Sequence, residues 1–347
     1  MSTNIQLVDE APRGYGSRSS DEKGLDVNSC FFLAADGGYF PYACLTARRI
    51  LDVSAATTPG FILYVGAGDD DMRVARRLLK GQVELVDVSS FMEKVRSGFR
   101  DSGIAAFIRL FADQIPEFEA YDRIAYTDCD VLFNRDIGDL TGQKLQAPLL
   151  AAHDDYMYLL PTYRQKLSMQ PGAPYFNSGV LLFDMISVRA QSLLEHTRQV
   201  AIEKKLNDQN ALNIAFEGKW QTMHPNWNLM SNYTKEYRFS QAYARHFSGS
   251  KPWGGQVGVE LDALAVYRDL AKDTPWLQRF RQRIPFERGV LKRLGRRIDA
   301  ARGLLLNDKR KKRRAYYDGR KTHKIYAEQA DSGALAVSFP EVLGGFA

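Results

Sequence analysis

Two aspartates separated by one residue, Asp128 and Asp130, form the pattern in this sequence that is best suited to binding a divalent cation. They follow a strand-like run at residues 123–127, and an apolar run at 131–133 comes directly after them. Burying two unpaired carboxylates at a strand end is costly, and a hard cation removes that cost because Mg²⁺ and Mn²⁺ prefer oxygen ligands. A diphosphate supplies further oxygens to the same ion. The alternative is a pair of turn or capping aspartates.

The same spacing occurs a second time, in the run Asp69–Asp71. Short motifs match freely, so the spacing alone is weak evidence for a metal site. We interpret Asp69–Asp71 as part of a solvated loop, because no apolar segment continues from it as one does from Asp130.

A histidine far along the chain, His246, begins a short segment that also contains Gly249 and Lys251 and ends in Pro-Trp. A single histidine is more often a surface or core residue than a ligand. An imidazole beside two carboxylates would nevertheless suit Mn²⁺ better than Mg²⁺, because nitrogen is the softer donor. Lys251 could meet phosphate oxygens as a point charge, and Gly249 would allow the backbone to approach a phosphate closely.

Alternating strand and helix patterns must position these residues. We expect strands at 29–35, 61–65, 83–88, 123–127, 149–152 and 175–183, and helices at 41–52, 72–79, 102–111, 191–204 and 209–216. Such alternation predicts an α/β sheet with parallel members, and sheets of this kind bind ligands beyond the carboxyl ends of their strands. Asp36 and Asp128 follow two such ends.

Six segments, in this order, resemble family 8 of the retaining glycosyltransferases, which includes bacterial lipopolysaccharide galactosyl- and glucosyltransferases and glycogenin. They cover about residues 28 to 254. The segments are Phe-Leu-Ala-Ala-Asp36-Gly-Gly-Tyr39, Phe-Ile-Arg109-Leu, Tyr-Thr-Asp128-Cys-Asp130-Val-Leu, Tyr-Phe-Asn177-Ser178-Gly179-Val-Leu-Leu, Asn-Asp208-Gln209-Asn-Ala-Leu-Asn and His246-Phe-Ser-Gly249-Ser-Lys251-Pro-Trp. The resemblance implies a GT-A fold, with a mixed and mostly parallel sheet, and a nucleotide-diphospho-sugar donor.

The resemblance also implies a role for each candidate site residue. The uracil and ribose would be held by Ala34, Asp36 and Tyr39, the donor would be contacted by Arg109, and the diphosphate would be gripped by Gly249 and Lys251. A Mn²⁺ ion, with Mg²⁺ as an alternative, would be bound by Asp128, Asp130 and His246. The transferred sugar would be surrounded by Asp154, Asn177, Ser178, Asp208 and Gln209.

Retention of the anomeric configuration needs either a covalent intermediate or attack on the face from which the nucleotide leaves. The first route needs a nucleophile, for which Asp208, Asp154 and the amide of Gln209 are candidates, and an amide is a poor nucleophile. We therefore favour same-face attack, with Asp208 and Gln209 positioning the sugar. The sequence does not decide between galactose and glucose, and it favours a glycolipid or polysaccharide precursor as acceptor.

The charge of the chain is concentrated near its end. Residues 279–324 contain 18 Lys/Arg against 4 Asp/Glu, and Lys309–Arg314 are six consecutive cations. Apolar residues at three- and four-residue steps between 290 and 305 predict an amphipathic basic helix, which favours an anionic membrane surface over nucleic acid. We expect a disordered polar tail at 1–25, a catalytic domain at 26–255 and a basic helical region at 256–347.

The same features lead to an expected location and to two rival functions. Three cysteines without a CxxC pair fit a reducing cytoplasm, so we expect a cytoplasmic enzyme peripheral to the inner face of the cytoplasmic membrane. One rival is a sugar-nucleotide pyrophosphorylase, although its usual Gly-rich phosphate loop is absent after Asp36. The other is a non-catalytic nucleotide-sugar-binding membrane adaptor.

Overall fold

A computed structural model describes residues 27–55, 58–99, 103–154, 161–231, 238–249, 251–254, 259–280 and 327–328. The predicted tail at 1–25 and the basic segment beyond Phe280 lie outside the described residues. None of the helices that these residues form has the length and apolar character needed to cross a bilayer.

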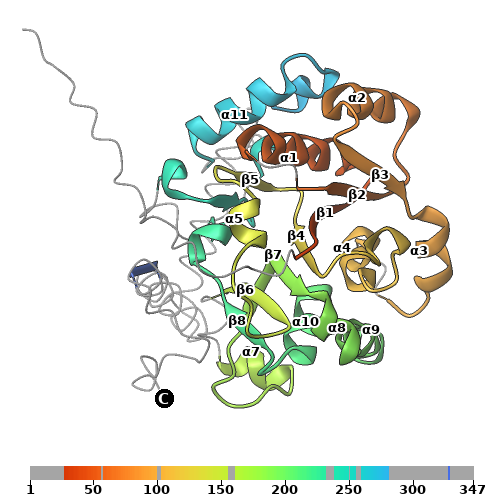
Figure 1. Ribbon diagram of the computed structural model, residues 1–347, viewed down its shortest axis with the longest axis vertical. Helices are drawn as coiled ribbons and strands as arrows, with labels where there is room; N and C mark the ends of the chain where they lie inside the picture. The colour runs from red at the N-terminus through yellow and green to blue at the C-terminus, as the bar shows by residue number, and fades with distance from the viewer. Residues whose placement is uncertain are drawn as a thin grey trace, which may run out of the picture.

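A seven-stranded mixed sheet, in the order β3-β2-β1-β4-β7-β6-β8, forms the centre of the molecule (Figure 1). Its members are β1 (Ser29–Asp36), β2 (Gly60–Val65), β3 (Val83–Asp87), β4 (Arg123–Thr127), β6 (Leu149–His153), β7 (Phe176–Asp184) and β8 (Trp220–Thr222). Most neighbours are parallel, and β7 runs antiparallel to both β4 and β6. The predicted α/β fold with a mostly parallel sheet is confirmed.

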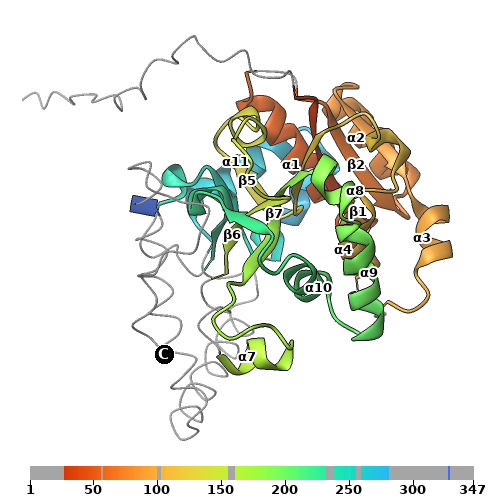
Figure 2. The ribbon, with the colours of Figure 1, turned by 60° about the horizontal axis from the view of Figure 1, so that its bottom comes forward.

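Side chains of the central strands are buried on both faces of the sheet. In β1, Phe31 and Leu33 belong to the core on one side, while Phe32 and Ala34 belong to the core on the other side. Successive side chains of a strand point to opposite faces, so a continuous apolar run requires helices on both. Figures 1 and 2 show α1, α2 and α11 on one side of the sheet and α4, α9 and α10 on the other.

The helices that the structure describes range in length from four residues in α5 to 14 residues in α1. They are α1 (Phe40–Val53), α2 (Asp69–Leu79), α3 (Ser89–Val95), α4 (Ile104–Ile108), α5 (Gly138–Thr141), α7 (Pro161–Lys166), α8 (Met185–Ala190), α9 (Leu193–Glu203), α10 (Asp208–Ala215) and α11 (Leu261–Ala271). Further 3₁₀ turns lie at Arg109–Phe111, Pro116–Phe118, Pro225–Asn228, Phe239–Gln241, Pro252–Gly254 and Pro275–Phe280. The helix expected at 102–111 is therefore α4 followed by a 3₁₀ turn.

The sheet brings three distant segments to one edge. β1 and β4 are parallel neighbours, so their carboxyl ends lead Asp36 and Asp128 to the same side. β7 begins where β4 ends, and the Asp128 N–H donates to the Gly179 carbonyl at 2.8 Å. The pairing of β7 with β6 shifts between Asn177 and Leu181, which is a bulge. Bulges re-aim side chains beside active sites, and this one lies next to Asp128.

A second, three-stranded sheet places the segment that contains His246 next to the aspartate pair. It consists of β5 (Val131–Phe133), β10 (Ala244–His246) and β9 (Leu229–Met230), with β10 in the middle. β10 runs antiparallel to β5 and pairs His246 with Val131. The Phe247 N–H then donates to the Asp130 carbonyl at 2.9 Å. This ladder is what brings His246 to the aspartate pair, 116 residues earlier in the chain.

Two features differ from the sequence-based expectations. Asp69–Asp71 are not a loop: they form the first turn of α2, where carboxylates are favoured by the helix dipole. The packed body also continues past residue 255, because α11 and the turn at Pro275–Phe280 belong to the same core as α1, and α11 contacts α1. Trp276 is buried there, and its indole Nε1–H donates to Asp71 Oδ1 at 2.6 Å.

Candidate active site

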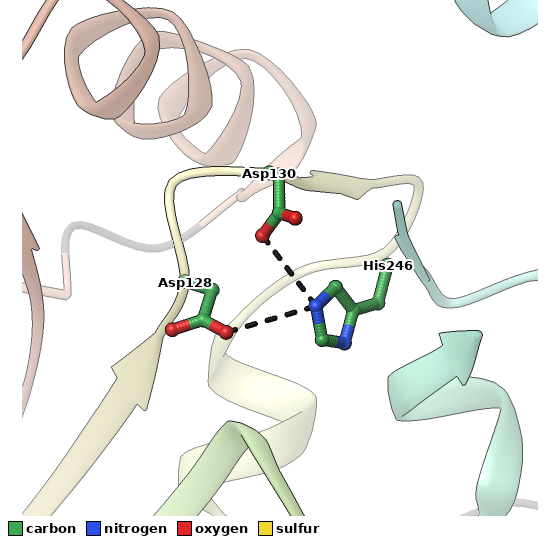
Figure 3. Close-up of side chains that lie close together, drawn as sticks. All are labelled: Asp128, Asp130 and His246. Carbon is green, nitrogen blue, oxygen red and sulfur yellow. Dashed lines mark ion pairs between the residues drawn. The ribbon is translucent and has the colours of Figure 1, made fainter. Parts of the chain in front are cut away.

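Three side chains, Asp128, Asp130 and His246, converge at the edge of the sheet; we call them the Asp–Asp–His triad (Figure 3). The Nε2 atom of His246 lies 3.6 Å from Asp128 Oδ2 and 3.5 Å from Asp130 Oδ1. One donor atom from each residue lies within 4.8 Å of the others. Two carboxylate oxygens and one imidazole nitrogen at this separation could hold a divalent cation. The triad is therefore a candidate metal site.

Lys251 adds a positive charge beside the triad. Its ammonium group makes an ion pair with Asp130 Oδ2 and donates to the Phe247 carbonyl at 2.9 Å. Burial opposes ionisation of Asp130, but His246 and Lys251 outweigh burial and hold the pKa of this carboxyl below its usual range. Burial likewise opposes the charge of Lys251, and Asp130 more than compensates, so the pKa of the ammonium is raised. Asp130 thus offers Oδ1 to the triad while Oδ2 stays on Lys251.

Arg109 connects the triad to the opposite wall of the site. This buried guanidinium contacts Asp128 Oδ1 at 2.8 Å through Nη2 and Asp208 Oδ2 at 3.4 Å through Nε. Its Nη1 donates to the Ser178 carbonyl at 2.8 Å, and it stacks 4.1 Å from the centre of the Tyr126 ring. Burial alone would lower the pKa of Arg109, but the two carboxylates outweigh it and raise that pKa. Arg109 therefore orients carboxylates on both sides of the site, and its predicted donor contact stays a prediction.

The N-terminus of α10 forms that opposite wall. Asn207 caps the helix by accepting from the Asn210 N–H at 2.9 Å, which leaves Asp208 and Gln209 in the first turn. The Ser178 hydroxyl lies 3.3 Å from both Asp208 Oδ2 and Gln209 Oε1. Burial raises the pKa of the Asp208 carboxyl, and Asp128 adds to the rise while Arg109 opposes it. Asp208 and Gln209 are thus held side by side at the positive end of a helix.

Amide groups continue this wall behind Asp208. Asn177 Nδ2 donates to Gln209 Oε1 at 3.3 Å and to Asp154 Oδ2 at 3.5 Å. Gln209 Nε2 donates to Asp154 Oδ2 at 3.4 Å and to the Tyr175 hydroxyl at 3.2 Å. We call Asp154, Asn177, Ser178, Asp208 and Gln209 the sugar-side network. The structure brings together all five residues that the sequence placed around the sugar.

The turn after β1 forms the third part of the site. The Asp36 side chain accepts from the Tyr39 N–H at 2.9 Å, which leaves the Tyr39 ring 42% exposed. An exposed ring beside a polar turn is available for stacking. A side chain at Gly37 would place its Cβ 2.3 Å from the Gly66 carbonyl oxygen, so the turn needs glycine. Ala34 completes this wall.

One cavity of about 420 Å³ joins the three parts. The predicted residues that line it are Ala34, Asp36, Tyr39, Arg109, Asp128, Asp130, Asn177, Ser178, Asp208, Gln209, His246 and Lys251. Two predicted residues do not line it. Asp154 is buried behind Asn177 and Gln209. Gly249 is exposed, and a Cβ added to it would lie 3.6 Å from Ser231 Cβ. Asp154 could act on a ligand only through Asn177 or Gln209, and Gly249 could contact a ligand only if the bound ligand extends beyond the cavity.

Asn228, Tyr126 and Gly179 support the triad, and sequence reasoning gave none of them a role. Asn228 Oδ1 lies 2.8 Å from His246 Nδ1, and the Tyr126 hydroxyl donates to Asp128 Oδ1 at 2.6 Å. Gly179 packs against His246 so closely that an added Cβ would lie 2.3 Å from His246 Cε1. The position of Gly179 after Asn-Ser was a signal that could have found it. Asn228 carries no motif at all, because it meets His246 only through the pairing of β9 with β10.

Solved structures with this architecture define the class of the fold. The galactosyltransferase LgtC in complex with donor and acceptor sugar analogues gives a TM-score of 0.60 at 21% identity, covering 75% of this chain and 98% of LgtC. The apo structure of the bifunctional glycosyltransferase WbbM gives 0.62 at 17% identity, covering 76% of this chain and 53% of WbbM. At these identities the likeness concerns the fold, which is that of the GT-A glycosyltransferases.

The family follows from the sequence match. The family model described as glycosyl transferase family 8 matches residues 30–256, more than half of the 347 residues. The chain therefore belongs to glycosyl transferase family 8, and its enzyme class is that of a glycosyltransferase.

Curated relatives agree with this family over part of their length. General stress protein A of Bacillus subtilis (strain 168) is 26% identical over 224 residues, covering 56% of this chain and 77% of the relative. Glycosyltransferase GlyF of Streptococcus pneumoniae serotype 4 (strain ATCC BAA-334 / TIGR4) is 29% identical over 181 residues, covering 48% and 42%. The match spans less than half the length of GlyF.

Proposed function

We propose that this chain is a retaining hexosyltransferase that moves galactose or glucose from a UDP-sugar to a glycolipid or polysaccharide-precursor acceptor with the help of Mn²⁺. The observation that carries the proposal is the convergence of three sets of groups in one cavity. These are the Asp36–Tyr39 turn, the Asp–Asp–His triad and the sugar-side network. A nucleoside, a diphosphate and a hexose need these three kinds of surroundings, in that order along the donor.

The triad and Lys251 would stabilise the charge that develops on the leaving UDP. When bound, the metal ion supplies Lewis-acid stabilisation of the diphosphate oxygens, which is often worth several kcal/mol in such reactions. Lys251 already lies at Asp130 and is a suitable point charge for a phosphate oxygen. Arg109 and Tyr126 both contact Asp128 Oδ1, so Asp128 Oδ2 is the oxygen that faces His246.

The sugar-side network favours positioning over covalent attack. Gln209 Oε1 already accepts from the Ser178 N–H at 3.1 Å, and an amide is a poor nucleophile. Asp208 Oδ2 is engaged by Arg109 and by the Ser178 hydroxyl. We therefore propose same-face attack, in which Asp208 and Gln209 orient the hexose and the leaving phosphate takes the proton of the acceptor.

Donor hydrolysis and transfer test this proposal directly. The purified chain should release UDP from UDP-galactose or UDP-glucose when Mn²⁺ is present, and EDTA should stop the release until Mn²⁺ is added back. Silence with every UDP-sugar tested would contradict an enzymatic role and favour the adaptor. Exchange of label between pyrophosphate and the donor would instead identify a pyrophosphorylase.

The basic segment supports a proposal for where the enzyme is located. We propose that residues 279–324 hold the enzyme at the inner, anionic face of the cytoplasmic membrane, because 18 cations among these residues would be attracted to acidic lipids. Replacing Lys309–Arg314 with glutamine should weaken binding to phosphatidylglycerol vesicles, and added salt should weaken the binding of the unaltered chain. Equal binding to neutral vesicles would refute an electrostatic contact.

A further inference from the structure

The bulge in β7 releases two backbone N–H groups from the sheet ladder, and one of them determines the orientation of an amide. The Gly179 N–H donates to Asn177 Oδ1 at 2.9 Å. A backbone N–H can only donate, so the atom of Asn177 that faces it must be the carbonyl oxygen. The other amide atom, Nδ2, then points to the sugar-side network, where it finds acceptors on Asp154 and Gln209. Both ends of Asn177 are thereby assigned.

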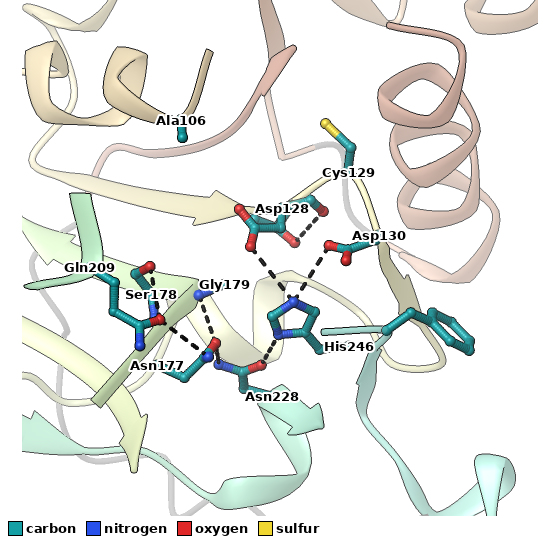
Figure 4. A network of polar contacts seen from close by, with 12 residues as sticks. Ala106, Asp128, Cys129, Asp130, Asn177, Ser178, Gly179, Gln209, Asn228 and His246 are labelled. Carbon is teal, nitrogen blue, oxygen red and sulfur yellow. Dashed lines mark hydrogen bonds and ion pairs between the residues drawn. The ribbon is translucent and has the colours of Figure 1, made fainter. Parts of the chain in front are cut away.

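The orientation of Asn177 determines that of Asn228. Asn228 Nδ2 lies 2.9 Å from the same Asn177 Oδ1 (Figure 4). If Asn228 were turned over, two carbonyl oxygens would face each other at that distance. The carbonyl Oδ1 of Asn228 is consequently the atom that lies 2.8 Å from His246 Nδ1.

The orientation of Asn228 in turn determines which ring nitrogen of His246 carries the proton. An amide oxygen accepts and cannot donate, so Nδ1 must bear the hydrogen of this contact. A neutral His246 therefore has its lone pair on Nε2, the atom that faces Asp128 and Asp130. The ring is 4% exposed, Asn228 1% and Asn177 7%, which leaves solvent little opportunity to offer Nδ1 another partner.

We propose that Asn228 is a positioning residue that holds His246 in the Nδ1–H tautomer, so that Nε2 is ready to bind a divalent cation together with the two aspartates. The proposal rests on the proposed metal-dependent function. Groups that orient a metal-binding histidine through its second nitrogen typically change metal affinity by 10–100-fold when they are removed. Asn177 bonds both to Gln209 of the sugar-side network and to Asn228. These hydrogen bonds therefore connect the sugar-side network to the candidate metal site.

Two substitutions and a neighbouring control test the role of Asn228. Asn228→Leu has a similar size and removes the acceptor, and we expect Mn²⁺ to bind about 10–100-fold more weakly. Asn228→Asp keeps an oxygen acceptor for Nδ1–H but loses the donor to Asn177 Oδ1, so its Mn²⁺ affinity should fall less than that of Asn228→Leu. Asn226→Ala changes an asparagine on the same 3₁₀ turn that bonds to Gln241 instead, and it should leave Mn²⁺ affinity unchanged. Affinity is measured by electron paramagnetic resonance of free Mn²⁺, and unfolding midpoints verify that each variant is folded.

A spectroscopic measurement on the metal-free chain separates positioning from packing. Nitrogen-15 shifts of histidine rings distinguish a protonated from an unprotonated ring nitrogen, and the signals of His246 among the five histidines are assigned from their loss in His246→Gln. The unaltered chain, Asn228→Asp and Asn226→Ala should show the Nδ1–H form at alkaline pH, and Asn228→Leu should show a mixture. The proposal is overturned if Asn228→Leu retains both the tautomer and the affinity, or if Asn228→Asp loses them as fully.

Failure of the proposed function gives a different result. A chain that binds no Mn²⁺ in its unaltered form would contradict the proposed metal dependence, while the tautomer of His246 in Asn228→Leu would still decide whether Asn228 controls the ring.

Discussion

The Asp–Asp–His triad and the sugar-side network share a cavity, but their side chains are held by different means. The triad holds two carboxylates close to one imidazole, balanced from outside by Arg109 and Lys251. The sugar-side network consists mainly of amide and hydroxyl groups whose orientations are determined by backbone N–H groups of the β7 bulge. The carboxylates of the triad are thus balanced by cationic side chains, whereas the amide and hydroxyl groups of the network bond to one another and to backbone N–H groups. Changes on the two sides should have different consequences.

A buried histidine lies in the triad and another lies next to the network in sequence, and their surroundings differ. His246 lies between two carboxylates and an amide oxygen. His153, at the end of β6 beside Asp154, has its Nε2 2.9 Å from the Thr222 hydroxyl and its ring tilted against Trp220. Burial lowers the pKa of His153 to about 3. His246 is a candidate ligand because two carboxylates converge on it.

The largest expected effect is the removal of a triad carboxylate. Asp130→Asn leaves the shape of the site but removes a charge from the metal, so Mn²⁺-dependent UDP release should fall about 10³-fold, equivalent to about 4 kcal/mol of lost transition-state stabilisation. Steady-state assays over a range of Mn²⁺ concentrations measure it. Asp70→Asn provides the control, because Asp70 belongs to the second acidic run but lies exposed on α2, so this variant should behave as the unaltered chain. Equal activity of the two variants would remove the metal role of Asp130.

A change on the sugar side should be smaller and of a different kind. Asp208→Asn leaves the Asp–Asp–His triad intact but alters the contacts with Arg109 and Ser178. Turnover should fall about 10²-fold, the usual cost of a misplaced reacting group, while Mn²⁺ affinity stays the same. Measuring kcat and Mn²⁺ binding on the same preparation separates the two sides. Unchanged turnover would reject the positioning role of Asp208.

A substitution at Gly179, which lies between the triad and the sugar-side network, should lower the stability of the fold. Gly179→Ala places a Cβ 2.3 Å from His246 Cε1, and the strand and the ring cannot both stay in place. We expect a loss of about 1–3 kcal/mol in the free energy of unfolding, measured in urea, together with weaker Mn²⁺ binding. Gly68→Ala is the matched substitution, because an added Cβ there meets nothing within 4 Å; Gly68 is the N-cap of α2, so the change should cost about 0.5–1 kcal/mol and leave Mn²⁺ binding unchanged. Similar losses for both would contradict the close packing of Gly179.

The smallest effect concerns His153 and the pH dependence of stability. Its pKa is lowered from 6.5 to about 3 in the folded chain, so below pH 6.5 the unfolded state binds a proton that the folded state refuses. The stability contributed by neutral His153 is complete above pH 6.5 and is lost as the pH falls toward 3, by about 1.4 kcal/mol per pH unit. Urea unfolding of the unaltered chain and His153→Gln at pH 7.5 and pH 5 checks this. The difference between the two should shift in favour of the glutamine variant at pH 5, and a constant difference would contradict burial of a neutral ring.

Much of the fold was predictable because its signals are local. Apolar runs bounded by glycine and aspartate indicated β1, β2 and β4 within a residue or two, and helical periodicity indicated α1 and α9. Local patterns failed where tertiary contacts override them. The acidic run at 69–71 forms the first turn of α2, and Asp71 in this turn accepts a hydrogen bond from Trp276, which is 205 residues away. The chain beyond residue 255 looked separate in composition, yet α11 packs against α1.

For the site, the sequence by itself determined which residue types are present and in what order: the aspartate pair, the distant histidine and the asparagine–serine–glycine segment of β7. Only the tertiary structure decided that Asn228 faces His246, that Gly179 leaves room for the ring and that Arg109 joins the two walls. The physical reason is that hydrogen-bond direction depends on which backbone groups a bulge releases and which strands pair. Neither is encoded in any single local run of residues.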